Sequence, residues 1–457
     1  MRPFSRWLSC RAWSVACILA AGSTGSGCGD AVEPDQDAGL SDADVVDAGN
    51  ADAAPADAGE ADAAAPTFSV AATVSGFAGS GLVLQLNGGG DVTVDDDGVF
   101  TFPGSLAGGA SYEVTVAAQP SCPARICTVT DGTGTVGDDD VSVTVTCVVP
   151  LLRLISHNWG SPQTVRITDD MASLADAATA VPRIVTGAST GVGSTKIDSI
   201  ASDGGRDLIY AVARVATPEP SVLVFTSAST ATGDVAPARQ ITITGASNIS
   251  GIELDESADR LYVSGDSGNL YIVDDASTAN GTATPTTIPL TSPGAISLDR
   301  RTDRLYVAAT ATSLYVFDGA RALTSASTPT HTVTWTVPTD FARGIAVDGC
   351  RDRLYLAIRN VSSGANVYAF DDASTIDGAL DLSTASQAQV AVPDTQVMSI
   401  GLDPLGALYL WKDSATTVRI FDTPETFTGA ASPTPDRSIS AVVSSGYGLD
   451  VMAYEPP

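Results

Sequence analysis

The sequence has few of the residues on which catalysis and anion binding commonly depend. Among its 457 residues there are two histidines, His157 and His331, and two lysines, Lys196 and Lys412. Two histidines cannot supply a histidine-rich metal site, and these two lie too far apart in the sequence to form the His-Glu-x-x-His motif of a zinc protease. The sequence also contains no phosphate-binding P-loop. The net charge of −30 argues against nucleic acid and anionic lipid as partners, because binding to phosphate requires clustered positive charge.

The N-terminal apolar run is too short to span a bilayer. It covers residues 12–21, whereas a spanning helix takes about 20 residues, and arginines at positions 2, 6 and 11 precede it. This order is typical of an export signal. Small residues then lead to Cys28 in a segment that resembles a bacterial lipobox, although Gly25 stands where leucine is usual. We expect residues 1–28 to be a signal peptide and Cys28 to be acylated; ordinary signal-peptidase cleavage nearby is the alternative.

Residues 29–66 have few large apolar side chains. They are aspartate and alanine with glycine and proline, and they include eleven carboxylates but no lysine or arginine. Such a segment has too little apolar surface to offset its ordering entropy, so we expect it to be disordered. Behind a lipidated cysteine it would form a tether spanning on the order of 35 Å. A solubilising spacer is the alternative.

What the chain has in abundance is one repeated pattern. Between residues 200 and 410, an apolar-x-apolar-Asp segment, a polar turn and an (Asp-Arg)-Leu-Tyr segment occur five times. Each copy contains four short alternating runs, which predict half-buried strands. Four-stranded units of about 40–50 residues in series are typical of β-propeller blades. The tyrosines, which lie 52, 44, 49 and 54 residues apart, are Tyr210, Tyr262, Tyr306, Tyr355 and Tyr409.

The two ends of the repeat region each contain part of a further unit. Residues 152–170 look like the second and third strands of a blade, and residues 447–451 look like the first. Sharing one blade between the termini would remove unpaired strand edges. We therefore predict an all-β protein in which residues 150–457 form a six-bladed β-propeller closed by both termini.

The segment Gly344–Asp348 reads Gly-Ile-Ala-Val-Asp, and the copies resemble the innermost strands of bacterial NHL-type six-bladed propellers. The resemblance covers residues 151–457 and implies an architecture rather than an activity, because propellers host many unrelated functions. The aspartates of the Asp-x-x-x-Asp-Arg turns could bind metal or accept backbone N–H bonds within the turn, and we expect the second role. We predict no metal site, no cofactor and no catalytic residue.

Residues 67–149 have a different pattern of short strand-like runs, at 68–74, 82–86 and 112–116. Asp97-Gly98, between two further runs, is a strong hairpin signal. About 80 residues with many short strands predict a small β-sandwich. The segment resembles an Ig-like repeat of secreted bacterial proteins, a resemblance that implies a role in spacing or presenting another domain.

The cysteines agree with export. Cys127 and Cys147 lie in the last two predicted strands of the sandwich, where we expect a disulfide worth about 3 kcal/mol in the chain-entropy model. Cys122 and Cys350 are left over. They could pair with each other, but we expect both to be free.

A binding patch is expected on the propeller face that carries the loops between second and third strands. Tryptophan beside polar groups is typical of recognition surfaces; packing inside a blade is the alternative. Gly187–Gly191 matches the Gly-x-Ser-x-Gly spacing of a nucleophile elbow, but no helix is predicted after it, so we expect a loop. The candidate binding residues are His157, Asn158, Trp159, Arg214, Arg359, Trp411 and Lys412.

Together these features predict a non-enzymatic cell-envelope lipoprotein, anchored in the outer membrane by acylation alone and facing the periplasm or the cell surface. Its propeller would bind an envelope protein or a glycan. The first alternative is a metal-dependent hydrolase that resembles the six-bladed gluconolactonases, which hold a divalent metal with Glu, Asn and Asp side chains. Glu253 and the turn aspartates are present here, without an evident Asn partner. A purely structural envelope protein is the second alternative.

Overall fold

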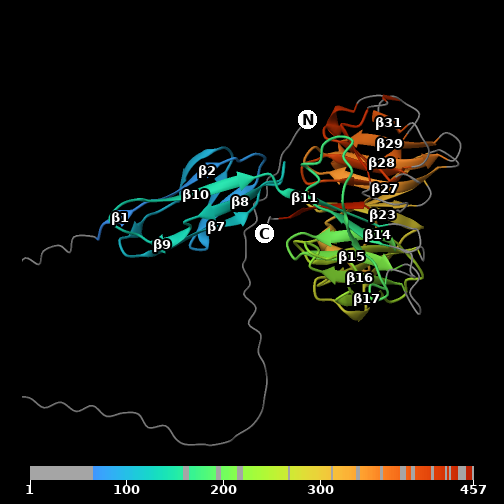
Figure 1. Cartoon of the computed structure of the whole chain (residues 1–457), viewed down its shortest axis with the longest axis horizontal. Helices are drawn as coiled ribbons and strands as arrows, with labels where there is room; N and C mark the ends of the chain where they lie inside the picture. Colours follow the sequence, from blue (N-terminus) through green and yellow to red (C-terminus); the bar gives the residue numbers. More distant parts are fainter. Residues whose placement is uncertain are drawn as a thin grey trace, which may run out of the picture. The chain divides into compact units, whose positions relative to one another are not determined.

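The computed structural model describes most of residues 65–457 (Figure 1). Within this part the fold is all-β, with strands and the 3-10 helices η1 (Ala320–Ala322), η2 (Ala373–Thr375) and η3 (Pro424–Thr426). No helix of the described part is long and apolar enough to cross a membrane. The predicted signal peptide, Cys28 and the predicted tether lie outside the described residues. Also outside are residues 158–163, 192–196, 214–219, 266–267, 310–311, 336–339, 361–363, 381–387, 393–396, 413–415, 428–429, 432–433, 441–448 and 455–457.

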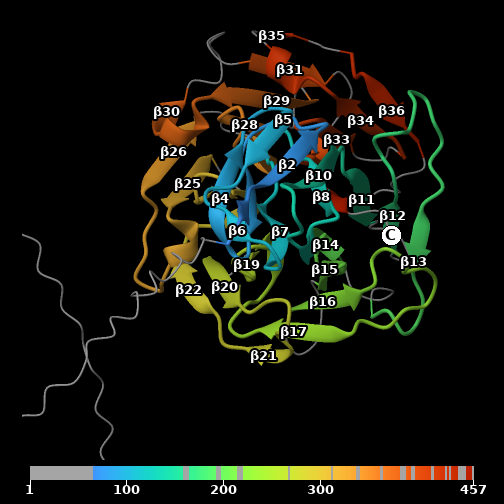
Figure 2. The same cartoon turned by 90° about the vertical axis from the view of Figure 1, so that its left-hand side faces the viewer.

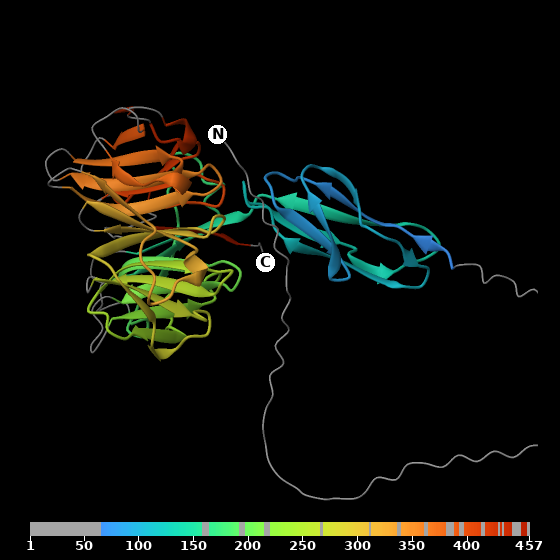
Figure 3. The same ribbon diagram turned by 180° about the vertical axis from the view of Figure 1, so that it is seen from behind.

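Residues 65–149, the N-terminal unit, form two four-stranded sheets around a shared core (Figure 3). One sheet has the order β5-β2-β10-β8 and the other β4-β3-β7-β9, and β1 pairs with β6. Alternate residues of β2 are buried, because successive side chains of a strand point to opposite faces. The strands are β1 (Thr67–Phe68), β2 (Val70–Ser75), β3 (Leu82–Leu86), β4 (Gly89–Val94), β5 (Gly98–Thr101), β6 (Leu106–Ala107), β7 (Ser111–Ala118), β8 (Ile126–Thr130), β9 (Thr133–Thr135) and β10 (Val141–Val148).

The predicted hairpin at Asp97-Gly98 is wrong. The strands on either side, β4 and β5, lie in different sheets, and Asp97 Oδ1 accepts a 2.7 Å hydrogen bond from the Phe77 N–H. The hairpin of this region joins β3 to β4 through Asn87-Gly88, whose φ angles are 53° and 72°. Two positive φ angles are what a type I′ turn requires. Local turn signals do not say which strands will pair, because sheet order is a tertiary property.

Residues 150–457, the repeat region, form six sheets of four or five strands. In five of them the first three strands come from consecutive segments of one repeat and pair antiparallel. The sixth has the order β13-β12-β11-β37, in which the C-terminal strand pairs with the N-terminal one and Asp450 lies opposite Ile155. The two ends therefore complete one sheet, as the sequence predicts. Three sheets also have an unpredicted fifth strand, donated in parallel by the following segment of chain.

The strands of the repeat region have the following bounds. The sheet that joins the two ends contains β11 (Leu151–His157), β12 (Val165–Thr168), β13 (Arg183–Val185) and β37 (Leu449–Tyr454). The next sheet contains β14 (Ile197–Asp203), β15 (Leu208–Ala213), β16 (Ser221–Thr226), β17 (Arg239–Ile243) and β21 (Gly281–Ala283). The third contains β18 (Ile249–Asp255), β19 (Arg260–Gly265), β20 (Asn269–Asp274) and β22 (Thr286–Pro289). The fourth contains β23 (Pro293–Asp299), β24 (Arg304–Ala309), β25 (Ser313–Asp318), β26 (His331–Trp335) and β30 (Gly378–Leu380). The fifth contains β27 (Asp340–Asp348), β28 (Arg353–Asn360), β29 (Gly364–Asp371), β31 (Ala388–Val392) and β35 (Ala430–Ala431). The last contains β32 (Val397–Leu402), β33 (Leu408–Lys412), β34 (Val418–Phe421) and β36 (Arg437–Ile439).

The first strands of the six sheets contact one another in a closed succession. β14 contacts β18, and the series continues through β23, β27, β32 and β37 back to β14. Figure 2 shows the outer strands β13, β17, β22, β26, β31 and β36 following one another around the periphery. The core lies between neighbouring sheets; Tyr262 of one sheet and Leu305 of the next, for example, are buried in one cluster.

Arginines reinforce the contacts between neighbouring sheets. Arg260 Nη1 donates to the Ala320 carbonyl of the following sheet at 3.1 Å. The same kind of bond connects the last sheet to the sheet that joins the two ends: Arg437 Nη1 donates to the Met171 carbonyl at 2.7 Å. The series therefore passes through every sheet and returns to its start. The other bonds run from Arg183 to Ala231, Arg239 to Ala276, Arg304 to Ala373 and Arg353 to Phe427.

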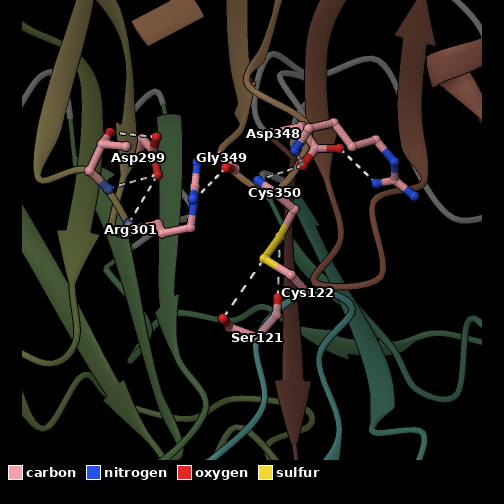
Figure 4. Close-up of a disulfide and its surroundings, with 9 residues drawn as sticks. Ser121, Cys122, Asp299, Arg301, Asp348, Gly349 and Cys350 are labelled. Atoms are coloured by element: carbon pink, nitrogen blue, oxygen red, sulfur yellow. Dashed lines mark hydrogen bonds and ion pairs between the residues drawn. A yellow bond between two sulfur atoms is a disulfide. The ribbon is translucent and has the colours of Figure 1, made fainter. Parts of the chain in front are cut away.

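The N-terminal unit contains one disulfide and shares another with the repeat region. Cys127 of β8 lies opposite Cys147 of β10, and the two form the predicted disulfide. The expectation that Cys122 and Cys350 are free is wrong, because they form a disulfide with their Cα atoms 5.4 Å apart (Figure 4). These cysteines are 228 residues apart in sequence. They meet because the β7–β8 loop contacts the turn between β27 and β28, which no sequence spacing reveals.

Candidate functional site

The turn aspartates have the structural role expected of them. Asp299 Oδ1 accepts from the Arg301 N–H at 2.9 Å, and Asp348 Oδ1 accepts from the Cys350 N–H at 3.0 Å (Figure 4). Such bonds satisfy the backbone of a tight turn and use the carboxylate as a turn former. The same pattern holds for Asp203, Asp255 and Asp403.

In the four turns that have a second aspartate, this residue binds a distant part of the same repeat. Asp259 accepts from the Ser277 N–H at 2.8 Å and from its hydroxyl at 2.6 Å. Asp352 makes the matching pair of bonds with Ser374. Both aspartates have positive φ, 51° and 53°, a conformation that Asp and Asn tolerate better than most residues. The repeated Asp-Arg and Ala-Ser-Thr segments are therefore structural partners.

The prediction of an exposed aromatic patch is wrong for His157 and Trp411, because both side chains are buried. His157 ends β11 and is fully buried, and Trp411 of β33 is 2% exposed. Trp411 belongs to the same core cluster as Tyr409, because residues two apart in a strand share a face. Packing inside the sheet, the alternative for Trp411, is thus its role.

The other candidate binding residues divide into two groups. Asn158, Trp159 and Arg214 lie outside the described residues. Arg359 lies in β28 and Lys412 in β33, strands of successive sheets. The structure therefore does not bring the predicted patch together as a described surface.

A group of opposite charges lies instead at the first strands. Arg300, directly after β23, donates from Nη2 to Glu253 Oε1 of β18 at 2.9 Å and also to the Leu254 carbonyl. Glu256 follows β18, and Asp450 of β37 accepts from the Ser202 hydroxyl of β14. We call Glu253, Glu256, Arg300 and Asp450 the first-strand charge cluster.

The cluster departs from the repeat at two positions. Glu253 and Asp450 occupy the position of the first strand that lies opposite the repeat tyrosine or its counterpart, Ile155. Glu256 and Arg300 occupy the position just after the turn aspartate. At the first position the other sheets have Ala201, Ser297, Ala346 and Gly401. At the second they have Gly204, Gly349 and Pro404.

Burial and like charge control the protonation of these carboxyls. Burial raises the pKa of Glu253 to about 7, against the opposing charge of Arg300. Burial likewise raises the pKa of Glu256 to about 7. It also raises the pKa of Asp450, although the hydrogen bond from Ser202 and the charge of Arg300 oppose the rise. Burial acts to lower the pKa of Arg300, but the carboxylates outweigh it, and the net change is upward. The site therefore favours a permanent positive charge.

The cluster does not fit the divalent metal that the hydrolase alternative requires. Arg300 already places a full positive charge 2.9 Å from Glu253 Oε1, where it would repel a metal ion. The positions equivalent to Glu253 contain no asparagine. In the part of the chain that the structure describes, no three His, Cys, Asp or Glu side chains are grouped as metal ligands.

Sequence reasoning noted Glu253 but missed its partners. One signal was available, since Arg300-Arg301 is a double arginine where three other copies have glycine or proline directly after the aspartate. The influence of the Asp450 charge on Arg300 had no local signal, because Asp450 lies in β37 and Arg300 follows β23, two strands far apart in the sequence.

Compared with protein-family models, the sequence matches none of them, and no curated protein gives a significant match.

Proposed function

We propose that the repeat region is an NHL-like six-bladed β-propeller preceded by an Ig-like β-sandwich. The protein would be an exported lipoprotein of the cell envelope that uses the propeller as a non-enzymatic binding or scaffold module. The closed succession of first strands and the sheet shared by the two ends support the propeller. Closure by both termini leaves none of the six sheets at the end of an open array.

The observation that carries the proposal is the disulfide between Cys122 and Cys350. Disulfides persist in oxidising compartments such as the periplasm and the cell surface, and they are rare in reducing ones. This bond also attaches the N-terminal unit to the repeat region at a second point, in addition to the peptide link near residue 150. The Ala124 N–H adds a 3.2 Å bond to the Pro404 carbonyl. Two separate attachments suit a spacer that presents the head in a constant orientation.

The repeat chemistry supports binding rather than catalysis. The turn aspartates and the arginines of the Asp-Arg segments are engaged in turns and in contacts between sheets. The metal required by the hydrolase alternative does not fit the first-strand charge cluster. An envelope protein or a glycan is the proposed partner, with Trp159 as the contact to test, because Trp411 is buried.

Cell fractionation and binding to isolated envelopes test this proposal together. We expect the full chain in the outer-membrane fraction, its release by Cys28→Ser, and a peptide linked through Cys122–Cys350 in non-reducing mass spectrometry. We also expect saturable binding to envelope glycan or protein that Trp159→Ala weakens at least tenfold. A cytosolic chain with free thiols would refute export, and an anchored chain without saturable binding would favour the purely structural alternative.

A further inference from the structure

The donated strand β21 is preceded by Asn280 and begins with Gly281. In an Asn-Gly pair the backbone nitrogen of glycine can attack the asparagine carboxamide, because glycine has no Cβ to obstruct the approach. We propose that Asn280 is a modification site, at which the folded chain converts its own asparagine to aspartate. The proposal goes beyond the proposed function and does not depend on what the module binds.

The structure places an attacking nitrogen and an oxyanion donor beside the Asn280 carboxamide. The Gly281 N–H donates to Asn280 Oδ1 at 3.0 Å, so the lone pair left on this nitrogen by deprotonation points toward the carboxamide. The Gln240 N–H of β17 donates to the same oxygen at 3.2 Å. A donor in this position stabilises the negative charge that develops on the oxygen during attack. Asn280 and Gly281 are both exposed, so water reaches them.

The reaction consumes only water. Hydroxide removes the Gly281 amide proton, the nitrogen forms a bond to Asn280 Cγ, and the Cγ–Nδ2 bond breaks. The leaving nitrogen takes a proton from water, which releases ammonia and regenerates hydroxide. Water then opens the resulting succinimide. Cleavage of the ring bond at Cγ gives aspartate, whereas cleavage at the backbone carbonyl carbon gives isoaspartate.

A second donated strand already has aspartate at this position. Asp377 precedes β30, and the Gly378 N–H donates to Asp377 Oδ1 at 2.8 Å. Gly281 and Gly378 both have φ of 75°, and each is the first paired residue of its parallel strand. Aspartate at position 280 therefore fits this turn. Isoaspartate would instead add a backbone atom before β21 and shift that strand against β17.

The sequence contains a second Asn-Gly pair, Asn87-Gly88, which is held differently. Asn87 Oδ1 accepts from the Glu113 N–H at 2.8 Å, and Nδ2 donates to the Ser111 carbonyl at 3.4 Å. Both bonds attach the carboxamide to β7, away from the nitrogen that would attack it. The sequence alone gives the two pairs the same reactivity, whereas the structure favours Asn280, and Asn87 serves as a control within the same chain.

The test is peptide mapping by mass spectrometry of the full chain, incubated folded at pH 8 and sampled over time. Asn280 should convert on the order of tenfold faster than Asn87, because its attacking nitrogen and oxyanion donor are already in place. In the urea-unfolded chain the two pairs should convert at similar rates, and Asn280 should not be slower in the folded chain than in the unfolded one. Asn280→Asp should unfold at the wild-type midpoint, because the product fits the turn.

Two results would overturn the proposal. One is an equal or faster conversion of Asn87 in the folded chain, which would show that the contacts of Asn280 do not promote attack. The other is a conversion of Asn280 that is slower in the folded chain than in urea, which would show that pairing of β21 with β17 protects the residue. A loss of stability in Asn280→Asp would contradict the fit of the product to the turn.

Discussion

At the scale of single residues, two carboxylates of the same strand, β18, have opposite pKa changes. Burial acts to raise the pKa of Asp255, but hydrogen bonds from Arg321 and Ser257 outweigh it and leave the pKa lowered. Two residues earlier, burial raises the pKa of Glu253 to about 7. The difference arises because Asp255 accepts several donors, whereas Glu253 shares one guanidinium with other carboxylates.

The raised pKa values of Glu253 and Glu256 predict a protein that is less stable at pH 8 than at pH 5. Between the ordinary glutamate pKa of 4.5 and about 7, the folded state binds more protons than the unfolded state. The free energy of unfolding therefore falls as the pH rises through this window, and each glutamate lowers it by at most about 1.4 kcal/mol for every increase of one in pH.

Thermal unfolding between pH 5 and pH 8 checks this prediction. Glu253→Gln should flatten the dependence on pH, whereas Glu113→Gln, which removes an exposed carboxylate of β7, should leave it unchanged. An identical pH dependence in the wild type and Glu253→Gln would contradict the assignment.

At the scale of elements, a repeat is held by bonds between its turn and the segment after its third strand. The alternating strands predict the sheets, but these bonds explain why the Asp-Arg turn and the Ala-Ser-Thr segment recur together. Asp352 meets two requirements of this turn. Its backbone adopts the left-handed conformation, with φ of 53°, and its carboxylate accepts two hydrogen bonds from Ser374.

Asp352→Ala is expected to destabilise the protein by about 1–3 kcal/mol, because Ser374 loses both acceptors and alanine disfavours the left-handed conformation. Asp352→Asn should cost less, since asparagine tolerates the same φ and keeps one acceptor oxygen. Thermal or denaturant unfolding of the two variants gives the comparison. Equal losses for Asn and Ala would show that charge, and not turn geometry, is what Asp352 contributes.

At the scale of the whole molecule, one strand pairing and one disulfide connect segments that are far apart in the sequence. The β11–β37 pairing closes the series of sheets, and the Cys122–Cys350 bond joins residues 228 apart in sequence, one in the N-terminal unit and one in the repeat region. In the chain-entropy model a loop of this size contributes about 5 kcal/mol, as an upper estimate.

Replacing both cysteines of this bond by serine should lower the unfolding midpoint and open the region around residue 122 to proteolysis. The repeat region should still fold, because its core clusters lie between its own sheets. Replacing Cys127 and Cys147 is the control, and it should affect only the N-terminal unit. A double variant with unchanged stability and protease resistance would show that non-covalent contacts suffice to hold the two parts together.

The sequence by itself determined the all-β class, the repeat with its strands, and the completion of one sheet by the two ends. These follow from alternation of side chains and from turn chemistry, which act over a few residues. Only the tertiary structure decided the burial of Trp411, the pairing of Cys122 with Cys350, and the ion pair of Arg300 with Glu253. Each depends on packing between segments far apart in the chain, because proximity there is set by how sheets stack rather than by any local spacing.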